Sequence, residues 1–368
     1  MSGYTKFRPT FTAGNIRYRI NDTTSIAGYF KCDNSVLSQA TYPELYNKVG
    51  LVPDGLNIWT VRTASTNTTQ FRVGLRYVND QFLHGSGGSL YSSTDGITWT
   101  ARTSGITQTL NDFAYGNGLY LYVASTGRLA TSDDAITWTI RTPDTVSNIN
   151  GALYANSLYL YCGNAGRLAT SDDGITWTRR TPTSVANLNK LEYGNSTYVV
   201  VGASGVVATS TDAITWTRRT PGSVQPINSI VYSTTDNQFV IVGGLGFLAT
   251  STDGITWTSQ NSGTTDTINR VVYGESMYMY ASRLGQIFTS TDAVTWTART
   301  SGKGSVLDGL AYGDGVFVYT GSFNPPFIAS ATKYTYNPVT EFVTPLDNFQ
   351  LIDDRGLATT AEFFIKHD

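Results

Sequence analysis

Short runs of alternating apolar and polar residues follow one another along most of the chain, separated by turns rich in Gly, Asn and Asp. A period of two residues is typical of strands that bury one face. In one stretch these runs predict four consecutive strands, at Leu188–Tyr193, Thr197–Gly202, Val206–Ser210 and Ile214–Arg218. The pattern therefore favours a β-rich chain of short, tightly connected strands.

The same pattern recurs about every 39 residues, and all 7 tryptophans fall at equivalent places in it. They are Trp59, Trp99, Trp138, Trp177, Trp216, Trp257 and Trp296. Four short strands in a repeat of about 40 residues is typical of one blade of a β-propeller. We therefore predict an all-β fold built on a seven-bladed β-propeller with four-stranded blades.

Six of the tryptophans end a longer motif, Ser-x-Asp-(Gly/Ala)-(Ile/Val)-Thr-Trp-Thr. Its aspartates are Asp95, Asp134, Asp173, Asp212, Asp253 and Asp292. We predict that each Asp accepts backbone N–H bonds in a tight turn, that the Ser hydroxyl bonds the other arm, and that Gly or Ala keeps the tip small. The Ile and Trp are expected on one face of the last strand, packed between blades.

This motif resembles the Asp-box, or BNR, repeat of sialidases and other propellers, although it is one residue shorter than the usual Ser-x-Asp-x-Gly-x-Thr-Trp. The resemblance implies that the six aspartates are structural, at the rim and away from any active centre. Arginines recur three residues after the tryptophans and are also expected at the rim, stacked on neighbouring aromatics rather than binding a ligand.

Closure of the ring can be predicted from the unpaired first repeat. Trp59 has the flanks of a fourth strand but no preceding strands, whereas three strands follow Trp296, ending near Phe327–Ser330. We predict that the strand at Trp59 completes the last blade, so that both ends of the propeller pair and no free edge remains. The alternative closing strand is Tyr334-Thr335-Tyr336.

The flanks resemble a different family. Cys32-Asp33 and Tyr42-Pro43-x-Leu45-Tyr46 are similar to the motif of phage tail collar domains, with Asn34 in place of the usual Gly. The expected continuation appears only after the propeller, in Phe342-Val343-Thr344-Pro345 and near Phe363. The resemblance implies a small α+β collar-like domain split by an inserted propeller. The predicted domains are 1–52 and 332–368, the two collar-like parts, and 53–331, the propeller.

Composition narrows the function classes. The net charge of −2 and pI near 5.7 give no reason to expect nucleic acid. No apolar run is long enough for a signal peptide or a membrane span. The two cysteines, Cys32 and Cys162, and the two histidines, His84 and His367, lie in no metal-ligand spacing, so we expect free thiols, no metal and no cofactor.

The candidate ligand-binding positions lie where the first strand of each repeat begins. A polar residue recurs twelve positions after each Trp and could ring one mouth of the central channel: Asn111, Asn150, Asn189, Asn228, Asn269 and Asp308. The other interpretation is that each side chain caps its own turn or bridges neighbouring blades. The next residue varies between repeats, and Lys190 and Arg270 stand out there as candidates for selectivity. Tyr-rich, weakly charged surfaces suit sugars.

We do not expect an enzyme. The recurring arginines would be spread around the rim and could not converge on one carboxylate, and the glutamates inside the ring, Glu192 and Glu275, occupy equivalent-looking positions on separate blades.

The collar resemblance instead implies a phage tail-fibre adhesin, located in the virion tail after synthesis in the host bacterial cytoplasm. Its expected partners are other tail proteins, through the flanks, and a bacterial surface glycan or protein. By the same resemblance we expect a homo-oligomer, a trimer or another ring. The alternatives are a non-catalytic scaffold for protein assembly and a sialidase-like glycoside hydrolase.

Overall fold

The computed structural model describes residues 74–321, apart from 144, 182–183, 300 and 302–305, together with 328–331 and the backbone of several strands outside this range. The chain divides into two compact units. One unit combines Met1–Gly55 with Tyr334–Asp368, and the other comprises Leu56–Lys333. The longer unit is the propeller.

The smaller unit is assembled from segments that precede and follow the propeller in the sequence. In its three-stranded sheet, β35 (Glu362–Lys366) lies between β1 (Ile16–Arg19) and β2 (Tyr29–Lys31). A second pair joins β3 (Val36–Ser38) to β32 (Glu341–Val343), and a third joins β33 (Leu351–Ile352) to β34 (Ala358–Thr359). The segment with the collar-like motif Tyr42-Pro43-x-Leu45-Tyr46 lies outside the described residues. The collar-like identity of this unit stays a prediction.

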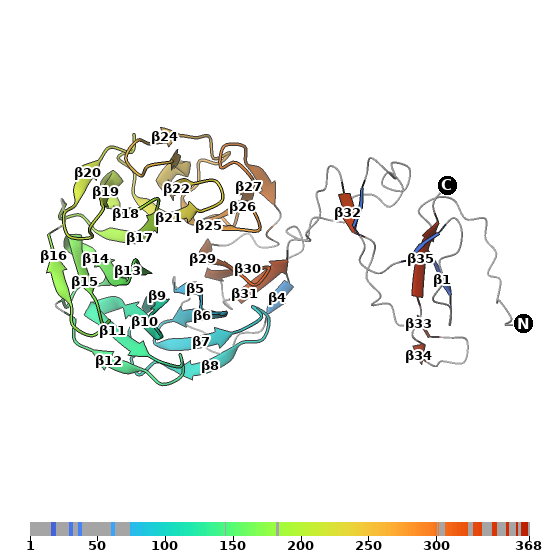
Figure 1. The fold of residues 1–368 in the computed structure, drawn as a ribbon, viewed down its shortest axis with the longest axis horizontal. Helices are drawn as coiled ribbons and strands as arrows, with labels where there is room; N and C mark the ends of the chain where they lie inside the picture. Colours follow the sequence, from blue (N-terminus) through green and yellow to red (C-terminus); the bar gives the residue numbers. More distant parts are fainter. Residues whose placement is uncertain are drawn as a thin grey trace, which may run out of the picture. The chain divides into compact units, whose positions relative to one another are not determined.

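Seven four-stranded antiparallel sheets form the propeller, which confirms the predicted fold (Figure 1). In each blade the first strand lies nearest the centre of the ring and the fourth lies at the rim. The first three blades are β5 (Leu75–Val78), β6 (Gln81–Ser86), β7 (Ser89–Ser93), β8 (Thr100–Thr103); β9 (Leu110–Gly116), β10 (Leu119–Ala124), β11 (Arg128–Ser132), β12 (Thr139–Arg141); and β13 (Ile149–Ala155), β14 (Leu158–Gly163), β15 (Arg167–Ser171), β16 (Thr178–Arg180).

Blades four to six repeat this arrangement. They are β17 (Leu188–Gly194), β18 (Thr197–Gly202), β19 (Val206–Ser210), β20 (Thr217–Arg219); β21 (Ile227–Ser233), β22 (Gln238–Gly243), β23 (Leu248–Ser251), β24 (Thr258–Ser259); and β25 (Ile268–Gly274), β26 (Met277–Ser282), β27 (Ile287–Ser290), β28 (Thr297–Arg299).

The seventh blade closes the ring with strands from both ends of the propeller. It contains β29 (Val306–Gly313), β30 (Val316–Ser322), β31 (Phe327–Thr332) and β4 (Thr60–Arg62). Strand β4 pairs with β31 in the register Ile328 to Arg62. The strand that follows Trp59 is therefore the closing strand, as predicted, and the alternative at Tyr334–Tyr336 is wrong. Closure in this way pairs the edge of β31 that would otherwise be free.

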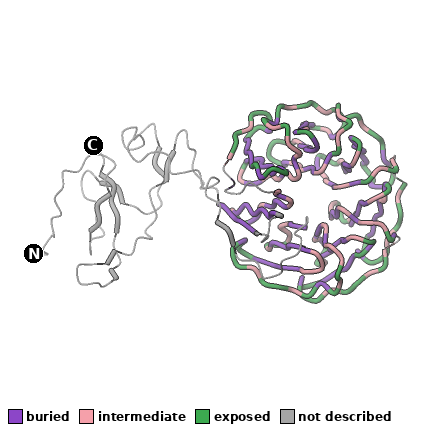
Figure 2. Tube along the Cα trace, turned by 180° about the vertical axis from the view of Figure 1, so that it is seen from behind, coloured by how far each residue is buried: buried purple, intermediate pink, exposed green. Residues whose placement is uncertain are grey.

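The hydrophobic core lies between neighbouring blades, whereas the rim is exposed (Figure 2). Leu153 and Leu160 of the third blade, for example, pack with Leu191 and Val200 of the fourth. The second strands are the most buried, and Tyr122, Tyr161 and Tyr280 occupy one equivalent position in three of them. Since each blade completes its neighbour's core, the ring is stabilised as a whole.

The fourth strand is shorter than predicted. In blade four it begins at Thr217 instead of Ile214, because Ile214–Trp216 still belong to the turn. Ile214 is 52% exposed, whereas Trp216 is 6% exposed. The prediction that Ile and Trp share one packed face is therefore wrong. The turn breaks the alternation of the strand, so only the Trp enters the interface between blades.

One buried histidine gives a testable pH dependence. His84 in β6 is fully buried, and its Nδ1 lies 3.1 Å from the carbonyl oxygen of Gly74. Burial lowers its pKa from 6.5 to about 4. Since the unfolded chain binds a proton at this site below about pH 6.5 and the folded chain does not, stability falls as the pH drops through that window.

We expect acidification from about pH 7 to about pH 4.5 to cost the wild-type chain about 2 to 3 kcal/mol more than it costs His84→Gln. Urea unfolding of both proteins at the two pH values measures this difference, and subtracting one from the other removes the contribution of the carboxyl groups. Equal losses in the two proteins would show that His84 does not stay neutral in the fold.

Candidate functional site

The six Ser-x-Asp-(Gly/Ala)-(Ile/Val)-Thr-Trp-Thr motifs, called boxes below, share one geometry. In blade four, Asp212 Oδ1 accepts the backbone N–H groups of Ile214 and Thr215, each at 2.8 Å, and the hydroxyl of Ser210 at 2.8 Å. The same three bonds recur at the other five boxes, with Asp95, Asp134, Asp173, Asp253 and Asp292 as acceptors. The backbone bonds lower the pKa of Asp212 to about 2. The aspartates thus hold the turns together, as the sequence predicts.

The residue after each aspartate must be small for a conformational reason. It has a positive φ at all six boxes, for example 68° at Gly96 and 59° at Ala213. The left-handed region is disfavoured for residues with a bulky Cβ substituent. In five of the six boxes its carbonyl oxygen also accepts the indole N–H of the box Trp, at 3.1 Å for Ala213 and Trp216, and Trp177 is the exception. The box therefore fixes its own turn through the Asp and holds the Trp against that turn.

The rim arginines are held by hydrogen bonds within their own blades. The Nε of Arg141 donates to Thr131 Oγ1 at 2.8 Å, from the fourth strand to the third. Equivalent bonds are made by Arg102, Arg180, Arg219 and Arg299. These strand-to-strand bonds are what the structure shows for the arginines, and stacking on neighbouring aromatic rings stays a prediction. These side chains repeat around the rim and do not converge.

The polar residues at the channel mouth tie neighbouring blades together. Each asparagine donates from Nδ2 to the backbone carbonyl that precedes the equivalent residue of the next blade, as Asn189 does to Ile227 at 2.8 Å. Asn111, Asn150, Asn228 and Asn269 make the same bond at 2.7–2.9 Å. The bridging interpretation is confirmed for these five residues. Binding of a ligand by them stays a prediction, and one amide N–H of each is already used in the bridge.

Other residues of the first strands carry the charges of the channel. Lys190 Nζ lies 2.8 Å from Asp112 Oδ2, and Arg76 Nη1 lies 3.4 Å from the same oxygen. The backbone N–H of Ala152 also donates to it, at 3.0 Å. The three charged side chains come from β5, β9 and β17, three different blades. An ion-pair cluster therefore crosses the channel, where the otherwise repetitive sequence loses its symmetry.

Burial and mutual attraction set the protonation of these groups. Burial lowers the pKa of Lys190 from 10.5 to about 8, and Asp112 partly opposes this effect. Lys190 and Arg76 together outweigh burial at Asp112, so the pKa of Asp112 stays below its ordinary value. Burial raises the pKa of Glu192, two residues along β17. Asp112 is thus an ionised partner, whereas Glu192 retains a proton more readily.

A cavity of about 160 Å³ lies beside this cluster in the channel. Arg76, Lys190, Glu192 and Arg270 line it together with tyrosines of the first strands. The two residues singled out from the sequence for selectivity, Lys190 and Arg270, are thus brought to one cavity. Arg76 was not identified from the sequence, although its departure from the repeat was a usable signal, and Asp112 was identified only as one of the variable positions after the asparagines and not as an acid partner.

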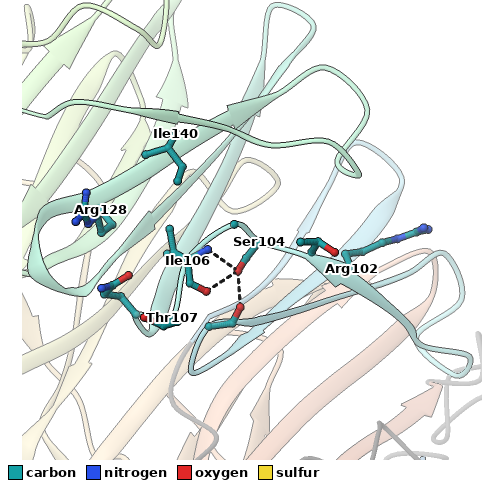
Figure 3. Close-up of a pocket in the computed structure, with 10 residues that line it drawn as sticks. Arg102, Ser104, Ile106, Thr107, Arg128 and Ile140 are labelled. Atoms are coloured by element: carbon teal, nitrogen blue, oxygen red, sulfur yellow. Dashed lines mark hydrogen bonds between the residues drawn. The ribbon is translucent and has the colours of Figure 1, made fainter.

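A second, open groove of about 640 Å³ lies at the rim between the first two blades (Figure 3). Arg102, Arg128 and the exposed Ile140 line it. The hydroxyl of Ser104 donates to the carbonyl oxygen of Ile106 in its own loop and to that of Gly88 in the turn between β6 and β7. Arg102 is one of the repeated rim arginines and already bonds Ser92. This groove therefore lacks the departure from the repeat that distinguishes the residues of the channel.

The two glutamates of the ring do not occupy equivalent places. Glu192 lines the channel, whereas Glu275 lies in the turn between β25 and β26, where its Oε1 accepts the hydroxyl of Tyr312 at 2.6 Å. The expectation of equivalent positions was wrong because repeat spacing alone does not separate a strand from its turn. Cys162 is a buried free thiol. Within the described residues, no group of acidic, His or Cys side chains could hold a metal ion.

The fold and this channel define the protein as a seven-bladed β-propeller with a charged central channel. No family model matches the chain, and no curated protein matches it. Solved structures do match. YCF48 from Cyanidioschyzon merolae has a TM-score of 0.60 and 13% identity, over 74% of this chain and 98% of that one.

A structure of YCF48 bound to D1 peptide gives a TM-score of 0.61 and 15% identity over 76% and 96% of the two chains. The computationally designed Ika8 protein gives 0.53 and 12% over 74% and 100%. These similarities show the propeller fold. Separately, no helix in the described part of the chain is long and apolar enough to cross a membrane.

Proposed function

We propose that this protein is a non-catalytic recognition protein of a phage tail, whose propeller binds a glycan of the bacterial surface through its central channel. The observation that supports this proposal is that the charged residues of the channel depart from the repeat. The boxes, rim arginines and bridging asparagines repeat from blade to blade, whereas Arg76, Asp112, Lys190 and Arg270 occur once each and meet in the channel. Residues that depart from a structural repeat and converge on one cavity are the natural carriers of selectivity.

Attachment to a tail is supported by the flanks. Their resemblance to collar domains depends on Cys32-Asp33 and Tyr42-Pro43-x-Leu45-Tyr46. The pairing of β1 and β2 with β35 brings the two ends of the chain into one unit, which is what a split attachment domain requires. In this proposal the smaller unit contacts other tail proteins, and the assembled virion carries the protein as a trimer or another homo-oligomer.

Binding without catalysis agrees with the state of one carboxyl group of the channel, that of Asp112. Asp112 is neutralised by two cations and a backbone N–H, so it is not available as a nucleophile or base. The rim arginines donate to their own blades and do not form a carboxylate-binding group. We therefore propose no bond-breaking step.

The test is binding of the labelled full-length protein to envelope preparations from a panel of bacteria. We expect saturable binding to at least one envelope, lost after enzymatic removal of its surface polysaccharide. A chain lacking residues 1–52 is expected to lose incorporation into particles. Absence of binding to every envelope, or release of sugars from the polysaccharide, would contradict the proposal.

A second candidate is a scaffold that holds a protein segment. It is favoured by one observation, that a protein of similar fold, YCF48, has a solved structure bound to D1 peptide. In that case binding to the envelope would survive removal of polysaccharide and be abolished by protease. The two treatments therefore distinguish the two functions.

A further inference from the structure

Arg270 has hydrogen-bonding capacity that the described residues do not use. Its Nη1 donates to the carbonyl oxygens of Asn269 at 2.9 Å and of Asn228 at 3.4 Å. Its Nε and Nη2 donate to none of the described residues, and no described carboxylate is within ion-pair distance of it. Burial lowers its pKa, which the more distant Asp112 and Asp308 oppose. The guanidinium therefore lies at the cavity wall with donors available to a ligand.

Acceptors with unused capacity lie in the same region. Glu192 Oε1 accepts the N–H of Tyr193 at 3.1 Å, and Glu192 lines the cavity with Arg270. Oδ1 of the fully buried Asp112 has no hydrogen-bond partner in the described part of the chain, although Oδ2 has three. A buried acceptor left without a donor costs about 1 to 3 kcal/mol, but Asp112 is not among the residues that line the cavity, so Glu192 is the acceptor available to a ligand there.

The size and walls of the cavity restrict the ligand further. Its volume of about 160 Å³ is small beside the roughly 300 Å³ at which pockets for drug-sized ligands begin. It would accept one sugar unit or the end of a chain. Tyr77, Tyr273 and Tyr312 line it. Aromatic rings offer apolar faces together with hydroxyl groups, which suits a sugar better than a flexible peptide end.

We propose that the channel cavity binds a sugar carboxylate, such as the uronic acid at the end of an acidic glycan. Arg270 contacts the carboxylate through its unused donors, and Glu192 accepts hydrogen bonds from the sugar hydroxyls. Arginine suits this role because its planar fork matches the two oxygens of a carboxylate. The inference rests on the proposed function in naming a glycan, and it specifies the chemistry that the channel selects.

The experiment is titration calorimetry of the full-length protein with glucuronate and galacturonate. Glucose and a short peptide with a free carboxyl end are the comparison ligands. We expect both uronates to bind and glucose to bind at least about tenfold more weakly, since a charge-assisted bidentate contact is lost. Raising the salt concentration from about 50 mM to about 500 mM is expected to weaken the binding of the uronates and to leave the binding of glucose unchanged.

The variant Arg270→Gln should weaken uronate binding about tenfold or more. Arg283→Gln is the matched control, because Arg283 is exposed on the same blade outside the channel, and its binding should equal that of the wild type. If Arg270→Gln does not fold, Arg270→Lys, which keeps the charge without the planar fork, should bind uronate more weakly than the wild type.

Equal binding of glucose and uronate, equal effects of Arg270→Gln and Arg283→Gln, or binding of the peptide alone would each overturn the inference. Loss of the inference and loss of the proposed function are distinguishable. If the wild-type protein binds envelopes but no uronate, only the inference of a sugar carboxylate is contradicted. If it binds uronate but no envelope, only the proposed function as a tail adhesin is contradicted.

Discussion

Asp112→Asn is expected to lower the free energy of unfolding by about 3 to 5 kcal/mol. Asp112 is 1% exposed, and its carboxylate compensates Lys190, which is 9% exposed, at 2.8 Å. It also faces Arg76 at 3.4 Å. The substitution keeps the size of the side chain and removes its charge, so two cations remain in a poorly solvated channel. Removal of one partner is costly because the other partner stays buried and unpaired.

A double substitution separates charge from packing. In Asp112→Asn with Lys190→Met, the lysine charge is removed together with its partner, and we expect about half of the lost stability to return. Urea unfolding of the wild type, both single variants and the double variant measures the coupling. Additive losses in the double variant would mean that the ion pair contributes nothing and that the channel tolerates the lysine charge alone.

The pH dependence gives a second check on Asp112→Asn. The pKa of Lys190 is already lowered to about 8 in the presence of the aspartate. Without the aspartate it must fall further, whereas the unfolded value stays near 10.5. Between these two values the unfolded chain binds more protons than the folded chain, so the stability of the variant rises with pH. A stability that is flat or falling from about pH 7 to about pH 9 would contradict this account.

Gly246→Ala is expected to destabilise the propeller by about 3 to 5 kcal/mol, because a left-handed conformation and a backbone clash add together. Gly246 has a φ of 71°, and a Cβ at this position would lie 1.9 Å from the carbonyl oxygen of Thr264. A backbone atom in a connection between blades cannot rotate away, so the two segments must separate. Gly127 and Gly205 show the same close approach in other blades.

Gly118→Ala is the matched control for that experiment. Gly118 has a φ of 75°, but nothing lies within 4 Å of the added Cβ. Its loss should be only about 1 to 2 kcal/mol, the cost of the left-handed conformation. Thermal or urea unfolding of both variants isolates the contribution of the clash. Equal losses would show that the turn at Gly246 can move and that the packing between blades is softer than the structure indicates.

Much of the fold was predictable because the sequence pattern of one blade recurs along most of the chain. The spacing of the tryptophans gave the number of blades, and the solitary copy at Trp59 indicated the closing strand, which β4 then supplied. Local chemistry was predictable where it depends on neighbours in sequence, as at Asp212, whose partners lie within three residues. The error at Ile214 arose because a strand pattern was extended through residues that the same turn bends out of the sheet.

The candidate site was predictable only in part. Lys190 and Arg270 were identified as departures from the repeat, but no pattern in the chain links Lys190 to Asp112, 78 positions away, or to Arg76. The asparagines were a clear repeat whose role could not be decided, since a donor's partner on the next blade is about 38 residues away. The asparagines were easy to find because they recur in the repeat, and they recur because they join neighbouring blades.

By itself, the sequence determined the seven blades, the boxes at the rim and the positions at which the repeat is broken, because these depend on local turns and on periodic burial. Only the tertiary structure decided what those broken positions form together. Closing the ring brings the first strands of all blades around one channel, so residues far apart in the chain share one poorly solvated space. There Asp112 is joined to two cations and Arg270 keeps donors for a ligand.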